Sequence, residues 1–103
     1  MRTSELTGAA LDWAVAQCEG TLHDDGTVPD YYRPSIDWEQ GGPIIECEGI
    51  SLDYDGIGLW IATIITNGSV FTKVDKTPLI AAMRCYVASK LGDDIEVPAD
   101  LFQ

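Results

Sequence analysis

Residues 59–73 constrain the fold more than any other stretch, because they join a long β-prone run to a strong hairpin signal. Residues 59–66 (LWIATIIT) are almost all apolar or β-branched, which predicts a central strand buried on both faces. Asn67-Gly68 follows directly, and this dipeptide is typical of a two-residue hairpin turn. Residues 69–73 are then expected to return as the antiparallel partner of the first strand.

A third strand is predicted just before this hairpin. Ile50, Leu52 and Tyr54 alternate with polar residues, which is the period of a strand with one buried face. Asp55-Gly56 then begins a turn. The middle of the chain therefore predicts a three-stranded antiparallel meander.

Two long helices are expected on either side of this meander in the sequence. The first covers about residues 4–18, with an N-cap oxygen from Thr3 or Ser4 and a left-handed stop at Gly20. The last begins with Thr77 as N-cap and Pro78 in its first position, and ends before Gly92. The polar residues on its solvent side are expected to be Arg84, Ser89 and Lys90.

These elements predict an α+β fold in which two main helices pack on a three-stranded antiparallel meander, one helix on each face of the sheet. Residues 1–103 are expected to form a single domain, because this length matches one ordinary core. The acidic C-terminal tail, residues 93–103, is expected to lie along the surface.

Two segments between the first helix and the meander are less regular. Residues 21–42 contain several glycines, prolines and aspartates and follow no period, so they predict a long loop. Residues 43–48 (PIIECE) fit either a strand or a short helix. The helix is favoured, because a proline stands in the first position and Gly49 follows the run.

The charge balance excludes some partners. Acidic residues outnumber basic ones 17 to 6, for a formal net charge of -11, while 46% of residues are hydrophobic. A globular domain this acidic repels phosphate backbones and anionic lipid, so we expect no direct nucleic-acid binding and no membrane binding. Residues 73–90 are the exception, because they hold four basic residues and one acid.

Location and redox state follow from the same composition. The longest stretch without charge, residues 57–71, is interrupted by glycine, threonine and asparagine and falls short of a membrane span. The first residues do not resemble a signal peptide. Cys18, Cys47 and Cys85 are odd in number and widely spaced, which is typical of reduced thiols in a reducing cytoplasm.

The chain shows no pattern typical of an enzyme. His23 is the single histidine and sits in a turn-like HDDG segment, and no zinc-ligand spacing surrounds it. A nucleophile elbow, a phosphate-binding loop and a base near any cysteine are all missing. We therefore expect no enzymatic activity, no catalytic residue, no metal and no cofactor.

Acidic residues on the first helix suggest a different possibility. Glu5, Asp12 and Glu19 recur every seven positions and would form one stripe. Three charges are too sparse to imitate DNA, which has one charge per ~1.7 Å of axis. A DNA mimic would need further acids of the loop and residues 43–48 on the same face.

The loop offers the best candidates for a binding surface. It combines aromatic residues, one arginine, small hydroxyls and glycines, which are the residue types that binding surfaces recruit. The aromatics would otherwise only fill space beneath the loop. The candidate binding residues are Tyr31, Tyr32, Arg33, Ser35, Asp37, Trp38, Gly41, Gly42 and, as a cation on the last helix, Arg84.

Three blocks of the chain resemble the NinX family of tailed-phage and prophage proteins, whose function is unknown. The blocks are residues 3–16 (TSELTGAALDWAVA), 37–46 (DWEQGGPIIE) and 77–92 (TPLIAAMRCYVASKLG), joined by Trp60 and Ala62. The order of elements is also similar to that of phage α-β-α sandwich domains. The resemblance implies an accessory phage protein and supplies no catalytic residues.

We therefore expect a phage-encoded accessory protein that acts by non-enzymatic binding, with a host or phage protein as its partner. One alternative is a counter-defence protein that sequesters a nucleotide signal or mimics DNA to inhibit a host nuclease. Another is a small structural module that forms a homodimer through the apolar first helix.

Overall fold

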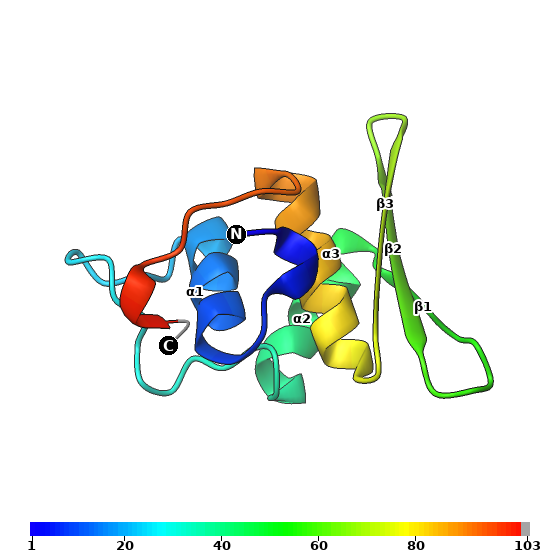
Figure 1. Ribbon diagram of the computed structural model, residues 1–103, viewed down its shortest axis with the longest axis horizontal. Coiled ribbons are helices and arrows are strands. Elements are labelled where there is room, and N and C mark those ends of the chain that lie inside the picture. Colours follow the sequence, from blue (N-terminus) through cyan, green and yellow to red (C-terminus); the bar gives the residue numbers. More distant parts are fainter. Residues whose placement is uncertain (102–103) are drawn as a thin grey trace.

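The computed structural model describes residues 1–101 (Figure 1). Three α-helices, three strands and two short 3-10 helices follow one another along this part of the chain. In order they are η1 (Thr3–Glu5), α1 (Gly8–Glu19), α2 (Trp38–Glu48), β1 (Ser51–Tyr54), β2 (Trp60–Thr66), β3 (Ser69–Asp75), α3 (Pro78–Leu91) and η2 (Ala99–Leu101). The predicted α+β class is confirmed.

The meander forms as the sequence predicts. Strand β2 is central and pairs antiparallel with β1 on one side and with β3 on the other. Asn67 has a φ of 51°, the left-handed backbone that an Asn-Gly hairpin turn requires. The Asp55 side chain accepts N–H groups of Ile57 and Leu59 and closes the β1–β2 turn.

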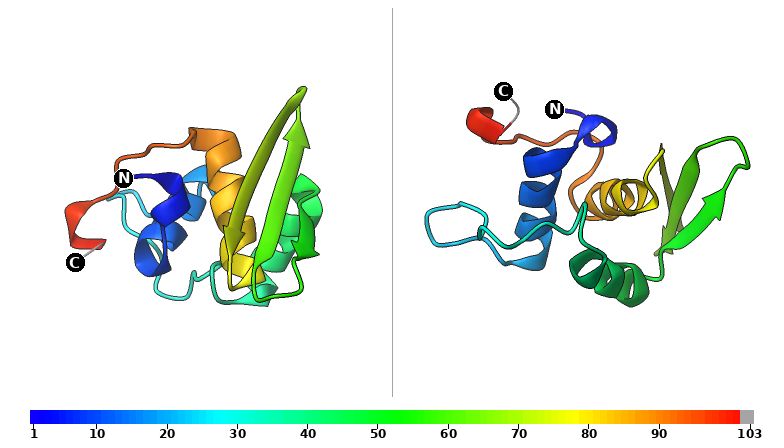
Figure 2. Two further views of the ribbon diagram at one scale, coloured as in Figure 1. Left: turned by 45° about the vertical axis from the view of Figure 1, so that its right-hand side comes forward. Right: turned by 90° about the horizontal axis from the view of Figure 1, so that it is seen from below.

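Helix α3 is the centre of the molecule. It lies between the sheet and α1, and α2 packs along a third side of it (Figure 2). All its residues from Ala81 to Ala88 are buried, as is Leu79. A helix apolar around most of its circumference needs cover on every side, and α3 has it.

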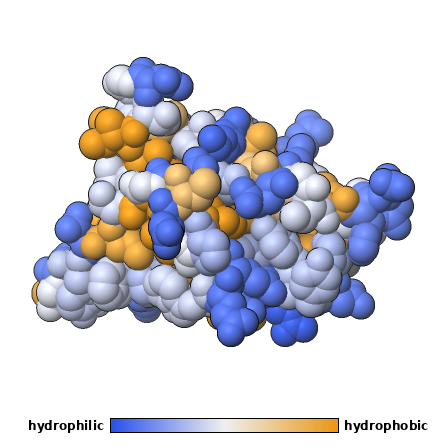
Figure 3. Space-filling view, turned by 180° about the vertical axis from the view of Figure 1, so that it is seen from behind, coloured by the Kyte–Doolittle hydropathy of each residue, from blue (hydrophilic) through white to orange (hydrophobic). Residues whose placement is uncertain are grey.

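The expectation of one helix on each sheet face is wrong. Within residues 1–101, α3 is the helix that packs extensively on the sheet, through the face that holds Ala62 and Ile64. On the opposite face Ile65 and its cross-strand partner Val70 are exposed, so β2 is not buried on both faces. Apolar residues gather beneath the polar hairpin tip in Figure 3. The layer order is therefore sheet, then α3 with α2 beside it, then α1 (Figure 2), and not an α-β-α sandwich.

Two helices start elsewhere than predicted. Residues 3–5 form the separate turn η1, and α1 begins only at Gly8. The positive φ of Gly8, 53°, prevents one continuous helix from running through both segments. Gly20 ends α1 in the left-handed conformation, as predicted. Helix α2 begins at Trp38, inside the predicted loop, because the Asp37 carboxylate accepts the Glu39 N–H and caps it.

The favoured helix for residues 43–48 is therefore confirmed as the end of α2, and Pro43 lies inside that helix rather than at its start. The loop spans residues 20–37 instead of 21–42. The remaining loop is long enough to fold over α1, and this arrangement creates the site described below.

The two ends of the described chain lie together. Arg2 and Asp94 form an antiparallel bridge, and Thr3 donates its hydroxyl to the Gly92 carbonyl at 2.6 Å. The tail then runs over α1 to η2 (Figure 1). Residues 102–103 of the predicted tail lie outside the described residues. Within residues 1–101, no helix has the length and apolar character needed to cross a membrane.

Candidate functional site

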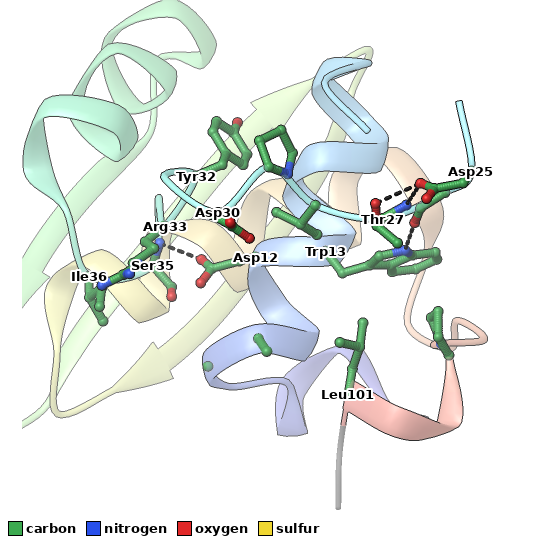
Figure 4. Close-up of a pocket in the computed structure, with 16 residues that line it drawn as sticks. Asp12, Trp13, Asp25, Thr27, Asp30, Tyr32, Arg33, Ser35, Ile36 and Leu101 are labelled. Atoms are coloured by element: carbon green, nitrogen blue, oxygen red, sulfur yellow. Dashed lines mark hydrogen bonds between the residues drawn. The ribbon is translucent and has the colours of Figure 1, made fainter. Parts of the chain in front are cut away.

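The loop and α1 enclose a pocket with a volume of about 720 Å³ (Figure 4). This volume lies within the range of about 300–1,000 Å³ that is typical of ligand sites. The first half of α1 forms one wall, loop residues 25–36 form another, and Pro98 and Leu101 close one side. We call this cavity the Asp12 pocket.

Asp12 is a buried carboxylate in this pocket. It is 7% exposed, and one of its oxygens accepts the backbone N–H of Ser35 at 2.9 Å. Burial raises the pKa of Asp12, while hydrogen bonding from Ser35 and the positive charge of Arg33 act in the opposite direction. No salt bridge to Asp12 forms within residues 1–101. A buried carboxylate without a counter-ion is unfavourable for folding.

The Ser35 hydroxyl adds a second unusual feature. Ser35 is 0% exposed, and its Oγ makes no hydrogen bond to any described residue. A buried polar atom without a partner costs about 1–3 kcal/mol, and native proteins contain few of them. Asp12 and Ser35 lie side by side in Figure 4, so two poorly satisfied oxygens line one cavity.

The rest of the pocket is largely apolar. The Trp13 indole is half-buried and donates its N–H to the Gly26 carbonyl at 3.2 Å, which holds the ring in place. Leu101 points toward that ring in Figure 4. The apolar and aromatic lining residues are Ala9, Trp13, Val28, Pro29, Tyr32, Ile36, Pro98 and Leu101.

Charged residues stand at the exposed edge. Asp25, Asp30 and Arg33 line the pocket and are exposed. Asp25 accepts both the backbone N–H and the hydroxyl of Thr27, and these hydrogen bonds lower the pKa of its carboxyl. Together with Asp12, the pocket lining has three acids and one base, so it favours a cation over an anion.

Helix α2 positions the loop over α1. The Gln40 side chain donates to the Tyr31 carbonyl at 2.6 Å and accepts the Arg33 backbone N–H. Gly41 leaves no room for a side chain, because an added Cβ would lie 2.5 Å from the Pro34 carbonyl oxygen and from Leu79 Cδ1. This close approach seats the loop against both α2 and α3.

The structure brings together three of the predicted binding residues. Tyr32, Arg33 and Ser35 all line the Asp12 pocket. Tyr31 and Trp38 are exposed on the same segment, at 73% and 53%.

The other four predicted residues have different places. Asp37 caps α2, Gly41 is the packing contact described above, and Gly42 faces open space. Arg84 is not on the solvent side of α3, because it is 8% exposed. Its guanidinium donates to the Leu6 and Val74 carbonyls and to Asp75, so it lies in the core and apart from the loop.

Sequence reasoning missed Asp12 and Trp13 as site residues. Asp12 was expected on an exposed acidic stripe with Glu5 and Glu19, and this stripe does not exist. Glu5 lies in η1, Asp12 is buried, and Glu19 accepts the Tyr86 hydroxyl. A charged residue in an otherwise apolar helix was the available signal, but only the folded loop shows what covers it.

The fold and the pocket define a small α+β protein with a buried carboxylate beneath a long loop. The family model described as bacteriophage P22 NinX matches residues 2–90. The chain therefore belongs to the NinX family and is a phage accessory protein. The match includes residues 21–34 and 53–58, which lie outside the blocks recognised in the sequence. No curated protein matches the chain.

Proposed function

We propose that this phage accessory protein acts by non-enzymatic binding of a host or phage protein in the bacterial cytoplasm, through the 31–38 segment beside the Asp12 pocket. The main supporting observation is the exposure of three large apolar side chains on eight consecutive residues. Tyr31, Ile36 and Trp38 are 73%, 65% and 53% exposed. Aromatic residues concentrated in one place beside a pocket are typical of protein-binding hot spots.

The distribution of charge supports a protein partner over a nucleotide. Among the described residues, Arg84 is bound to Asp75 and Lys73 to Asp93. Arg33 is the one base in the lining of the Asp12 pocket, which also includes three acids. Sequestering a nucleotide signal would need several convergent donors, so this counter-defence alternative has less support. DNA mimicry has less support too, since Asp12 is buried and Glu5 lies outside α1, so the first helix presents no acidic stripe.

Affinity capture tests the proposal. The tagged chain is recovered from phage-infected bacteria as wild type, as Tyr31→Ala/Trp38→Ala and as Ile57→Ala. Ile57 is the matched control, because it is 89% exposed and lies in the β1–β2 turn at the far end of the molecule (Figure 1). The double variant should bind the reproducible partner of wild type with an affinity at least about 30-fold lower, equivalent to about 2 kcal/mol.

Ile57→Ala should retain that partner at the level of wild type. The absence of any reproducible partner, or equal capture by all three proteins, would contradict the proposed function. Light scattering on the purified chain tests the homodimer alternative, which predicts twice the monomer mass.

A further inference from the structure

We propose that the Asp12 pocket binds the guanidinium group of an arginine side chain on the protein partner; this inference rests on the proposed function and identifies the chemistry of the same site. It explains why a buried acid and a buried hydroxyl remain without adequate partners inside the molecule. Both are 93% or more buried, and both line the cavity rather than the packed core.

The electrostatics of the pocket favour a cation. Asp12 has no counter-ion within residues 1–101, and Asp25 and Asp30 add negative charge at the edge. Arg33 is the one base in the lining and is exposed, so its charge is screened by solvent. A cation that enters would meet the buried carboxylate in a low-dielectric environment, where an ion pair is strongest.

The hydrogen-bonding geometry favours a donor with more than one N–H. The backbone N–H of Ser35 occupies one Asp12 oxygen, and the Ser35 hydroxyl beside the carboxylate makes no hydrogen bond of ordinary geometry to a described residue, although its proximity lowers the Asp12 pKa. Ser35 Oγ, next to it, is a second free acceptor. A guanidinium group presents five N–H donors in one plane and has no acceptor, so it satisfies two neighbouring oxygens together.

Arginine fits this pocket better than lysine. Guanidinium is more weakly hydrated than ammonium and loses less on entering an apolar cavity. It also stacks on aromatic faces, and the Trp13 ring is held in the wall by its hydrogen bond to Gly26. The apolar stem of arginine would contact the other walls, including Ile36, which also belongs to the exposed 31–38 segment.

Amide NMR titration with small probes tests this inference directly. The probes are acetyl-arginine-amide, the neutral isostere acetyl-citrulline-amide, acetyl-lysine-amide and agmatine. Arginine amide should shift the Trp13 indole and Ser35 amide signals, with lysine amide weaker and citrulline amide inactive. Acetyl-arginine-amide should bind at least as tightly as agmatine, because the site is expected to take a protein side chain.

Three variants assign the interaction to its residues. Asp12→Asn keeps the shape and the acceptor for Ser35 while removing the charge, and should weaken arginine-amide binding about 10- to 100-fold. Ser35→Ala should weaken it less, and it removes no hydrogen bond from the fold. Glu46→Gln removes an exposed charge on α2 and is the matched control, with affinity unchanged.

Several results would overturn the inference. Equal shifts with citrulline and arginine amides would show that charge is irrelevant, and tighter binding of agmatine would indicate a free small guanidinium compound. Partner capture that depends on Tyr31 and Trp38, together with no arginine binding, would overturn this inference alone. Arginine binding by a protein that captures no partner would instead contradict the proposed function.

Discussion

Two buried charged residues, Arg84 and Asp12, differ in how well the surrounding protein satisfies their charge. Arg84 is 8% exposed and Asp12 is 7% exposed, so burial alone does not distinguish them. Arg84 donates to Leu6 O at 2.7 Å, Val74 O at 3.3 Å and Asp75 Oδ1 at 3.0 Å. Asp12 accepts one backbone N–H and faces a cavity.

The contrast separates a structural charge from a candidate functional one. The Arg84 guanidinium joins α3 to β3 and to Leu6, the residue that follows η1, so its burial is compensated by contacts within the chain. The Asp12 carboxylate keeps the desolvation penalty without that compensation. Proteins retain such unfavourable groups where binding requires them, because the stability is recovered only when the ligand arrives.

The largest expected effect on stability comes from removing the Arg84 guanidinium. Arg84→Gln should lower the free energy of unfolding by about 3 kcal/mol, because it leaves the Leu6 carbonyl and Asp75 without their donor. Urea denaturation measures the loss. Lys90→Gln, on the same helix but exposed, should change stability by less than about 0.5 kcal/mol. Similar losses for the two variants would contradict the structural role of Arg84.

A smaller effect on stability is expected at Gly41, where the loop that covers Asp12 contacts α2 and α3. Gly41→Ala should cost about 1–3 kcal/mol, because its Cβ would collide with the Pro34 carbonyl and with Leu79. The same change at Gly42 meets open space within a helix and should be neutral or stabilising by about 0.5–1 kcal/mol. Denaturation of both variants, with the Trp13 indole signal as a second readout, tests whether α2 seats the loop.

The smallest expected effect is the pH dependence of Asp12. Its pKa is raised in the folded protein, so its ionisation opposes folding. This penalty is absent below the ordinary value of 3.8, grows as the pH rises toward the raised value, and is constant above it. Asp12→Asn has no such penalty. The stability of wild type relative to this variant, measured by denaturation of both proteins, should therefore improve as the pH is lowered through the raised pKa toward 3.8. A constant difference would contradict a buried, unpaired carboxylate.

Local signals in the sequence predicted most of the secondary structure. The Asn67-Gly68 turn, Pro78 at the start of α3 and Gly20 after α1 act on their immediate neighbours, so their effect can be predicted without tertiary contacts. The layer order could not be predicted in this way. A run of apolar residues in β2 is compatible with one covered face or two, and among the described residues α3 is the main cover.

The same limit applied to the site. Tyr32, Arg33 and Ser35 were identified by composition, but both buried charges were assigned to solvent because charged residues usually lie there. The partners that bury them are remote in sequence. Arg84 bonds to a residue 78 positions away, and Asp12 to one 23 positions away. Periodicity within one helix contains no information about such contacts.

The most direct test of the contrast is one variant measured in two ways. Asp12→Asn is compared with wild type for the free energy of unfolding at pH 7 and for the affinity of acetyl-arginine-amide. A binding role for Asp12 predicts equal or greater stability together with at least about tenfold weaker affinity. A loss of stability comparable to that of Arg84→Gln, with affinity unchanged, would contradict it and make Asp12 a structural residue.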